Sequence, residues 1–211
     1  MKLYLVRHGE TQRNRERLVQ GQGDQGLTEL GMAQALAVAR ALAGEGVTAL
    51  YHSPVKRALE SAAAIGLELG LDLQAAPGLE EMDTGELDGL SSQEMRSRYP
   101  EFMALWAKDA GSARLPGGET LAVVQERAWK AVQAIAGKHP DGVVAVVSHN
   151  FTICTLVCKA LDMPIAGFRQ FRVDLGSISA LEVTAERPRL ALLNSTFHLA
   201  EVGAQAAQEG R

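Results

Sequence analysis

The stretch that decides the fold is Leu3-Tyr4-Leu5-Val6-Arg7-His8-Gly9-Glu10-Thr11, close to the start of the chain. Its first four residues are apolar and predict a buried strand, which is followed at once by an arginine and a histidine. In α/β proteins, ligands bind at the edge of the sheet where the parallel strands end. We therefore expect Arg7 and His8 to face an anion at this edge, with the histidine acting as a base or a nucleophile.

The chain length and charge indicate one soluble α/β domain. The 211 residues are enough for a single domain with a sizeable core, and we expect residues 1–200 to form it and residues 201–211 to be a flexible tail. A net charge of −4 at pH 7 provides no overall attraction to nucleic acid or to an anionic membrane, so an anion site has to be local. The apolar runs are too short for a membrane span or a signal peptide. We expect a cytoplasmic protein with neither nucleic acid nor membrane as a partner.

The two cysteines do not have the spacing of a metal or disulfide site. Cys154 and Cys158 lie four residues apart in a helical pattern, and two buried thiols in a reducing compartment are the simpler interpretation. The sequence also contains no acidic metal-binding motif and no Walker-type glycine loop. We therefore expect no metal and no other cofactor.

Strands alternate with helices along most of the chain, which predicts a three-layer α/β sandwich with a mostly parallel central sheet and helices on both faces. Thr28 is expected to cap a helix that ends near Gly44. Ser53-Pro54 is expected to start the next helix, which runs to about Gly70. The later strands are expected at 47–51, 71–75 and 142–147, with an edge hairpin at 179–184 and 189–194.

Residues 90–110 predict a small pair of helices separated at Pro100. Their apolar positions follow helical spacing, and these are Met95, Tyr99, Phe102, Met103 and Trp106. The pattern is typical of an amphipathic cover packed on the domain. The same helices could form a lid over a substrate, since a lid also needs an apolar underside.

Four side chains with suitable chemistry follow predicted strands, and they are Arg7, His8, Arg57 and His149. Because parallel strands end at one edge of a sheet, we expect these side chains to meet in one cationic pocket. The planar guanidinium group suits phosphate or carboxylate, and arginines can neutralise the charge of a phosphoryl group during its transfer. A neutral histidine could attack phosphorus, and neighbouring cations favour the neutral form.

The leaving group of such a reaction needs a proton. At neutral pH, a carboxylic acid held partly protonated or a histidine can supply it. The acidic segment Glu80-Glu81-Met82-Asp83 offers a candidate acid from the loop side of the pocket.

The ordered motifs of the chain resemble those of the histidine phosphatase superfamily, also called the phosphoglycerate mutase-like family. They cover most of the chain in the family's order, which rarely arises by chance. The motifs are Leu5-Val6-Arg7-His8-Gly9-Glu10-Thr11 with Asn14, Gln20-Gly21, Leu27-Thr28 with Gly31 and Gln34-Ala35, Ser53-Pro54 with Lys56-Arg57-Ala58, Leu79-Glu80-Glu81 with Gly85 and Gly89, Gly117-Gly118-Glu119, and Val146-Val147-Ser148-His149. The resemblance implies a phosphoglycerate mutase-like fold.

The resemblance also implies a role for each residue at the phosphoryl end of the pocket. His8 would be the phosphorylated nucleophile, and Arg7 and Arg57 would hold the phosphoryl oxygens. His149 would stabilise the transferring group. No metal or cofactor is implied.

Glu81 occupies the family's proton-donor position, although Asp83 and Glu86 lie within reach of the same loop. The remaining residues expected at the site are Asn14 and Asn150 as phosphate ligands, and Gln20, Gly21, Gln22 and Gly23 in a substrate loop that acts partly through backbone amides. Asn150 stands where the family often has glycine.

We predict a phosphomonoesterase that needs no metal, forms a phosphohistidine on His8 and uses water as the final acceptor. Its substrate would be a small phosphorylated metabolite, such as phosphoserine or a broad set, because part of 193–199 resembles bacterial phosphoserine phosphatases of the family.

A phosphoglycerate-type mutase is the nearest alternative, but the stretch from Met82 to Gly118 is short where the glycolytic mutases carry a longer insertion. A non-catalytic phosphoester-binding module is a third alternative, against which the intact pairing of histidines and arginines argues. The late hairpin could pair two copies into a homodimer.

Overall fold

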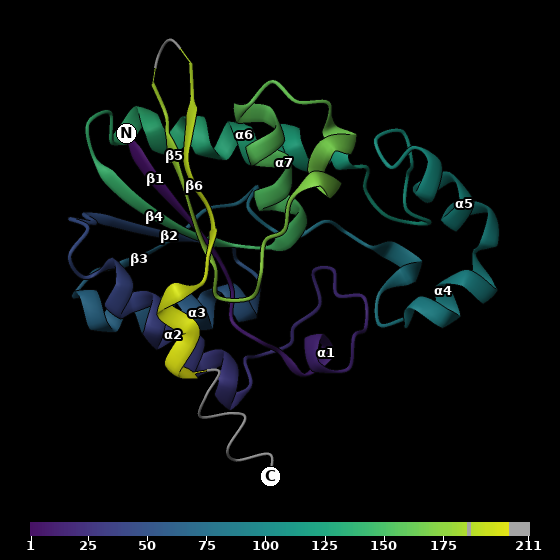
Figure 1. The fold of residues 1–211 in the computed structure, drawn as a ribbon, viewed down its shortest axis with the longest axis horizontal. Helices are drawn as coiled ribbons and strands as arrows, with labels where there is room; N and C mark the ends of the chain where they lie inside the picture. The colour runs from purple at the N-terminus through teal and green to yellow at the C-terminus, as the bar shows by residue number, and fades with distance from the viewer. Residues whose placement is uncertain (185–186, 203–211) are drawn as a thin grey trace.

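A six-stranded sheet runs through the centre of the protein, in the order β3-β2-β4-β1-β5-β6 (Figure 1). The computed structural model describes residues 1–184 and 187–202. The first four strands, β1 to β4, run parallel to one another, whereas β5 is antiparallel to both β1 and β6. The sheet is therefore mixed and mostly parallel. The strands are β1 (Lys2–Arg7), β2 (Ala49–His52), β3 (Leu73–Ala75), β4 (Val143–Ser148), β5 (Ile178–Glu182) and β6 (Arg189–Ser195).

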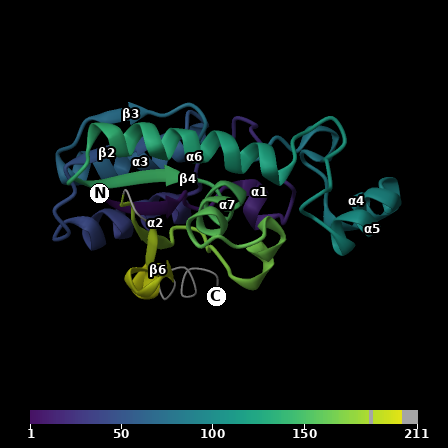
Figure 2. The ribbon, with the colours of Figure 1, turned by 90° about the horizontal axis from the view of Figure 1, so that it is seen from above.

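Helices cover both faces of this sheet, which confirms the predicted three-layer sandwich. Figure 1 shows α6 and α7 on one face and α2 and α3 on the other, and Figure 2 shows α6 and α7 lying over the strands. The helices are α1 (Gln12–Arg15), α2 (Glu29–Leu42), α3 (Lys56–Leu69), α4 (Ser92–Arg98), α5 (Pro100–Lys108), α6 (Leu121–Lys138) and α7 (Asn150–Ala160), with shorter 3-10 turns η1 (Gly85–Leu87), η2 (Ile165–Gln170) and η3 (Phe197–Leu199).

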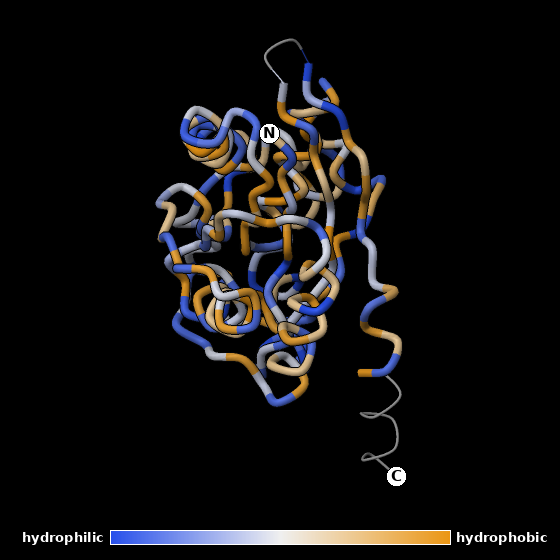
Figure 3. Tube along the Cα trace, turned by 90° about the vertical axis from the view of Figure 1, so that its left-hand side faces the viewer, coloured by the Kyte–Doolittle hydropathy of each residue, from blue (hydrophilic) through white to orange (hydrophobic). Residues whose placement is uncertain are grey.

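The two central strands carry apolar side chains toward both helical layers. In β1, Leu3 and Leu5 pack with the layer of α6 and α7, while Tyr4 and Val6 pack with the layer of α2 and α3. Residues of β4 alternate in the same way, and the colouring in Figure 3 shows hydrophobic segments at the centre of the fold. Burial on both faces explains why these strands are continuously apolar rather than alternating.

The register of β1 against β4 places the two histidines side by side. Arg7 is opposite Ser148, and the backbone N–H of His8 donates to the Ser148 carbonyl at 3.0 Å. His8 and His149 therefore leave adjacent parallel strands at the same edge of the sheet, as the sequence predicts. The edge hairpin is also confirmed, with β6 as the outer strand.

The predicted start of the third helix at Ser53-Pro54 is wrong, because α3 begins at Lys56 after Val55. The Ser53 hydroxyl accepts the N–H of Val55 at 3.2 Å in a turn that precedes the helix. Thr28 does cap α2, with its hydroxyl accepting the N–H of Gly31. The polar loop after β1 contains one helical turn, α1, that the sequence analysis did not predict.

Helices α4 and α5 lie outside the three layers and contact them through aromatic side chains. Trp106 of α5 packs against Phe151 and Phe168, at ring-centroid distances of 6.0 Å in both cases. Arg169 donates to the Ala107 carbonyl at 3.0 Å and so links η2 to α5. Residues 90–110 are thus a packed cover, as the spacing predicts. The predicted flexible tail begins at 201, and its residues 203–211 lie outside the described part of the chain.

Within the described part of the chain, none of the helices combines the length and the apolar character needed to cross a bilayer. The same residues contain no group of three or more histidine, cysteine, aspartate or glutamate side chains that could hold a metal ion. Cys154 and Cys158 are both buried free thiols on α7. Burial raises the pKa of Cys154 to about 12, so this thiol stays protonated.

Candidate active site

The carboxyl ends of β1, β2 and β4 bring the predicted site residues into one pocket. His8 follows β1, Arg57 lies in the first turn of α3 after β2, and His149 follows β4. The ring centroids of His8 and His149 are 5.2 Å apart, and Nε of Arg57 lies 3.0 Å from Nε2 of His8. The predicted convergence of these side chains is therefore present in the structure.

His8 is held as a neutral imidazole with a lone pair on Nε2. Its Nδ1 lies 2.7 Å from the carbonyl oxygen of Gly9, which can only accept, so Nδ1 carries the proton. Nε2 then accepts the hydrogen bond from Arg57. The ring is 2% exposed, and burial lowers the pKa of His8 well below its usual value, helped by the charges of Arg57 and Arg7. A neutral imidazole, with its lone pair on Nε2, is the nucleophilic form.

Arg57 connects the histidine to the substrate loop. Its Nη2 donates to the Gly21 carbonyl at 2.7 Å and its Nη1 to the Gly23 carbonyl at 3.3 Å. Burial lowers the pKa of Arg57 to about 10, so the side chain remains a cation at neutral pH. The structure thus places both glycines of the predicted loop at the site through their carbonyl groups. The Gly21 amide donates to Asp88 at 2.8 Å instead of facing the pocket.

Arg7 reaches the site with part of its guanidinium group free. Its Nη1 donates to the Val173 carbonyl at 2.6 Å, and its buried Nε has no hydrogen-bond partner among the described residues. A cavity of about 270 Å³ opens beside it. The residues that line this cavity are Arg7, Asn150, Cys154, Phe168, Arg169, Phe171, Arg172, Val173 and Asp174. Asn150, in the first turn of α7, is therefore close to Arg7, as predicted.

Glu81 is the carboxyl group that enters the pocket. It is 4% exposed, and its Oε1 accepts the backbone N–H groups of Met82 at 2.9 Å and of Phe151 at 3.1 Å. Burial raises the pKa of Glu81, although those N–H groups and the two arginines oppose the shift. The carboxyl group can therefore hold a proton at higher pH than an ordinary glutamate.

The other acids of this segment are engaged elsewhere. Asp83 accepts the N–H of Gly85, and Glu86 accepts the hydroxyl of Tyr99 at 3.0 Å. Glu80 accepts the N–H of Gly78 at 2.8 Å. Among the acids considered from the sequence, Glu81 is thus the buried one on which the charges of Arg7 and Arg57 act.

Ser53, which the sequence predicts as a helix cap, contacts His149 at the site. Its hydroxyl lies 2.8 Å from Nε2 of His149, and both side chains are fully buried. Burial lowers the pKa of His149 well below its usual value, with further lowering by Arg57 and His8. Nδ1 of His149 is buried and has no partner among the described residues, which leaves it available to a ligand. The signal in the sequence that could have identified Ser53 as a site residue is its position directly after β2.

The remaining predicted residues, Asn14, Gln20 and Gln22, bond to neighbouring parts of the chain and not to His8 or Arg57. Asn14 accepts the backbone N–H of Thr11 at 3.1 Å and its hydroxyl at 2.9 Å, in a capping box at the start of α1. Oε1 of Gln20 lies 2.8 Å from the same Thr11 hydroxyl, whose single proton Asn14 and Gln20 share. Gln22 donates to the Glu81 carbonyl at 2.9 Å and so ties the substrate loop to the acid segment.

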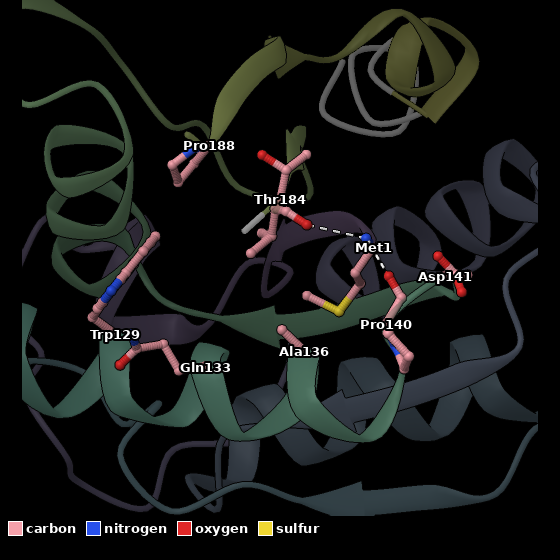
Figure 4. A pocket seen from close by; sticks show the side chains of 9 residues that line it. Met1, Trp129, Gln133, Ala136, Pro140, Asp141, Thr184 and Pro188 are labelled. Carbon is pink, nitrogen blue, oxygen red and sulfur yellow. Dashed lines mark hydrogen bonds between the residues drawn. The ribbon is translucent and has the colours of Figure 1, made fainter. Parts of the chain in front are cut away.

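A larger cavity, of about 730 Å³, lies near the amino ends of the strands, away from these residues. Figure 4 shows Met1 between Thr184 and Pro140 at this cavity, with Trp129 on the α6 side. The Met1 ammonium donates to the Pro140 carbonyl at 2.7 Å and to the Val183 carbonyl at 3.1 Å. None of the predicted site residues lines this larger cavity, whereas Arg7 and Asn150 line the smaller one.

Fold and site together define the class of the protein: it is an α/β phosphoryl-transfer enzyme in which a histidine stands in an arginine-lined pocket. The sequence model of the Histidine phosphatase superfamily (branch 1) matches residues 3–196. The chain therefore belongs to the histidine phosphatase superfamily, and it is a phosphoric monoester hydrolase.

Individual relatives agree with this family. The chain is 31% identical over 206 residues to "Phosphoserine phosphatase 1" of Hydrogenobacter thermophilus, covering 98% of both proteins. It is 33% identical over 182 residues to "Probable phosphoglycerate mutase GpmB" of Cronobacter sakazakii, covering 86% of this chain and 85% of that protein. Among solved structures, YhfR of Bacillus stearothermophilus superposes with a TM-score of 0.89 at 29% identity, covering 94% of this chain and 98% of that one.

Proposed function

We propose that the protein hydrolyses a small phosphorylated metabolite through a phosphohistidine formed on Nε2 of His8. The observation that carries this proposal is the hydrogen bond that Arg57 donates to Nε2 of His8, while Nδ1 donates to the Gly9 carbonyl. Nε2 therefore carries a lone pair, and it lies in a buried cationic pocket. The cationic surroundings favour attack by keeping the imidazole neutral and by attracting the phosphoryl dianion.

In the first step, Nε2 of His8 attacks phosphorus as the bond from phosphorus to the leaving oxygen breaks. The Glu81 carboxyl group gives its proton to that oxygen, and an alcohol departs. Arg7, Arg57 and His149 hold the three phosphoryl oxygens, and the two arginines offset their charge. Asn14 and Asn150 complete the phosphate contacts from the wall of the pocket.

In the second step, water attacks the phosphorus of the phosphohistidine. The Glu81 carboxylate takes a proton from this water, the bond between Nε2 and phosphorus breaks, and inorganic phosphate leaves. The same carboxyl group serves as acid and then as base, so it is ready for the next cycle once phosphate has gone. This order of steps needs Glu81 to hold a proton before the first attack, in keeping with the raised pKa.

The relatives favour a small substrate with a polar leaving group, such as phosphoserine. One relative carries the name of a phosphoserine phosphatase and another that of a phosphoglycerate mutase. A cavity of about 270 Å³ lies beside Arg7, one of the residues that we propose bind the phosphoryl group. Hydrolysis is preferred to mutase activity because the segment between Met82 and Gly118 is short.

We also propose that residues 1–200 act as a single domain, with α4 and α5 moving as a lid over the pocket. The link from Arg169 to α5 and the edge-to-face contact of Trp106 with Phe151 are contacts that such a motion would have to break. The protein would work in the cytoplasm and pair as a homodimer along the outer edge of β6. Sedimentation velocity tests the pairing, and a monomer at micromolar concentration would contradict it.

Trapping of the phosphoenzyme tests the main proposal. Brief exposure to a ³²P-labelled phosphoester should leave a label that is lost in acid and kept in base, and that is missing in the His8→Ala variant. Turnover by this variant at the normal rate would refute the nucleophile. Comparison of phosphate release from phosphoserine, sugar phosphates and an aryl phosphate with 3-phosphoglycerate isomerisation distinguishes phosphatase from mutase.

A further inference from the structure

An asparagine on the outermost strand is built into the support of Arg7. Asn194 lies on β6 and has a backbone φ of +52°, in the left-handed region that asparagine tolerates better than most residues. At this point β6 has one residue more than β5: Leu192 is opposite Ala180 and Ser195 is opposite Ile178. The strand therefore contains a β-bulge, a feature that redirects a side chain.

The bulge turns the Asn194 side chain toward the segment that precedes β5. Its Oδ1 accepts the backbone N–H of Asp174 at 2.6 Å, and its Nδ2 donates to Oδ2 of Asp174 at 2.9 Å. The backbone N–H of Asn194 donates to the Ser179 hydroxyl at 3.0 Å, so the amide of this bulged residue is paired. The two bonds of the Asn194 side chain hold Asp174 to β6, and the bond of its amide holds Asn194 to β5.

The segment held in this way carries the support of Arg7. Val173, next to Asp174, accepts the hydrogen bond from Nη1 of Arg7 at 2.6 Å. Gly176, two residues further on, donates its N–H to the Arg7 carbonyl at 3.1 Å. Side chain and backbone of Arg7 therefore both rest on a segment that Asn194 anchors from the far edge of the sheet.

We propose that Asn194 is a positioning residue for the Arg7 guanidinium group, acting through Val173 and Asp174. The proposal rests on the proposed function, in which Arg7 binds the phosphoryl oxygens. Its reason is geometric: an arginine that binds phosphate with two or three of its N–H groups needs a fixed plane, and the Val173 carbonyl sets that plane only while the segment stays in place.

Asn194→Gly isolates the side chain, because glycine adopts the same positive φ without strain. Inorganic phosphate serves as the probe, with its dissociation constant measured by titration calorimetry on the full chain. We expect that constant to rise about 10-fold and kcat/KM on an aryl phosphate to fall between about 10-fold and 100-fold, since small displacements of a binding group are that costly. The thermal midpoint should change by no more than about 4 °C.

Leu192→Gly is the matched control. It places a glycine in the same strand at a side chain that is 40% exposed and outside the network around Asp174. It should lower the thermal midpoint by a similar amount and leave the phosphate dissociation constant within two-fold of the parent. Equal loss of phosphate binding in both variants, or unchanged binding in Asn194→Gly, would overturn the positioning role.

An exchange of the two side chains provides a rescue. Asn194→Asp alone puts two carboxylates face to face and should weaken phosphate binding at least as much as Asn194→Gly. Combining it with Asp174→Asn reverses the bond between the two side chains and leaves the backbone N–H of residue 174 as donor to residue 194, so the double variant should recover binding relative to Asn194→Asp. No recovery would count against the proposal.

Phosphate binding does not require turnover, which separates this proposal from the proposed function. If the parent protein binds phosphate but releases none from phosphoesters, the hydrolase mechanism fails and the role of Asn194 is still measured. If the parent does not bind phosphate at all, the positioning role is refuted as well.

Discussion

Nε of Arg57 lies 3.0 Å from Nε2 of His8, and Nη1 and Nη2 of the same guanidinium each donate to a carbonyl of the substrate loop. One buried side chain thus orients the nucleophile, carries a positive charge beside it and fixes the loop that borders the pocket. The arrangement uses the rigid, planar geometry of arginine, which lysine cannot reproduce.

Arg57→Lys should therefore lower kcat by about 10² to 10³, because a lysine keeps the charge but loses the donor to Nε2 and the two carbonyl contacts. Steady-state hydrolysis of an aryl phosphate measures the effect. Arg13→Lys is the control, since Arg13 makes a partly exposed ion pair with Asp88 and should change kcat less than about three-fold. A kcat of Arg57→Lys equal to that of the parent would show that Arg57 acts only through its charge.

Ser53→Ala should lower kcat by about 10-fold and destabilise the protein by about 1–3 kcal/mol, because Nε2 of His149 would lose its partner in a fully buried place. Chemical denaturation and steady-state kinetics measure the two effects. Ser177→Ala is the matched control: its buried hydroxyl has no partner among the described residues, so its removal should cost little. A kcat equal to that of the parent would rule out a role of Ser53 at the site.

Glu81→Gln should separate the two chemical steps. With an alkyl phosphate, phosphoenzyme formation should slow by about 10² to 10⁴, because the leaving oxygen no longer receives a proton. An aryl phosphate has a better leaving group, so rapid quenching should still show a burst of phenol, followed by slow dephosphorylation. Asp83→Asn should behave like the parent protein. A missing burst with the aryl ester would show that Glu81 acts mainly in binding.

The same residue should determine the alkaline limb of the pH profile. Burial raises the pKa of Glu81, so the carboxyl group stays protonated to higher pH than usual and kcat/KM on an alkyl phosphate should fall as it ionises. The limb should disappear in Glu81→Gln. A limb that persists unchanged in this variant would assign it to another group.

Two buried neutral histidines should make the protein less stable in acid. His8 and His149 both have a pKa well below 6.5 in the folded state, mainly because of burial, whereas they regain about 6.5 on unfolding. As pH falls below about 6.5, the unfolded chain binds more protons than the folded one, so the free energy of unfolding decreases. Denaturant titrations between pH 7 and pH 5 measure it.

His8→Asn should flatten this dependence, because one of the two titrating groups is gone. His139→Asn is the control, since His139 lies outside the pocket and bonds the Tyr51 hydroxyl at 3.0 Å. An equal pH slope in the parent and in His8→Asn would mean that His8 is not held neutral in the folded state.

The sequence by itself determined the layers and the edge at which the site lies. Apolar runs such as 143–147 can be satisfied only by strands buried on both faces, and parallel strands have to end at a common edge. The positions of Arg7, His8, Arg57 and His149 relative to these strands followed from local pattern, and so their convergence could be predicted. Glu81 was selected by resemblance, because two other acids lie within the same loop.

Only the tertiary structure decided the contacts between segments that are far apart in the chain. The turn at Ser53 resembles a helix start by composition, but the helix begins later because the hydroxyl is held between the Val55 amide and His149, which is 96 residues away. Likewise, the bulge at Asn194 depends on the register between β5 and β6. Such contacts depend on packing across the sheet, which local propensity and spacing do not specify, and they complete the pocket that Arg7 and His8 begin.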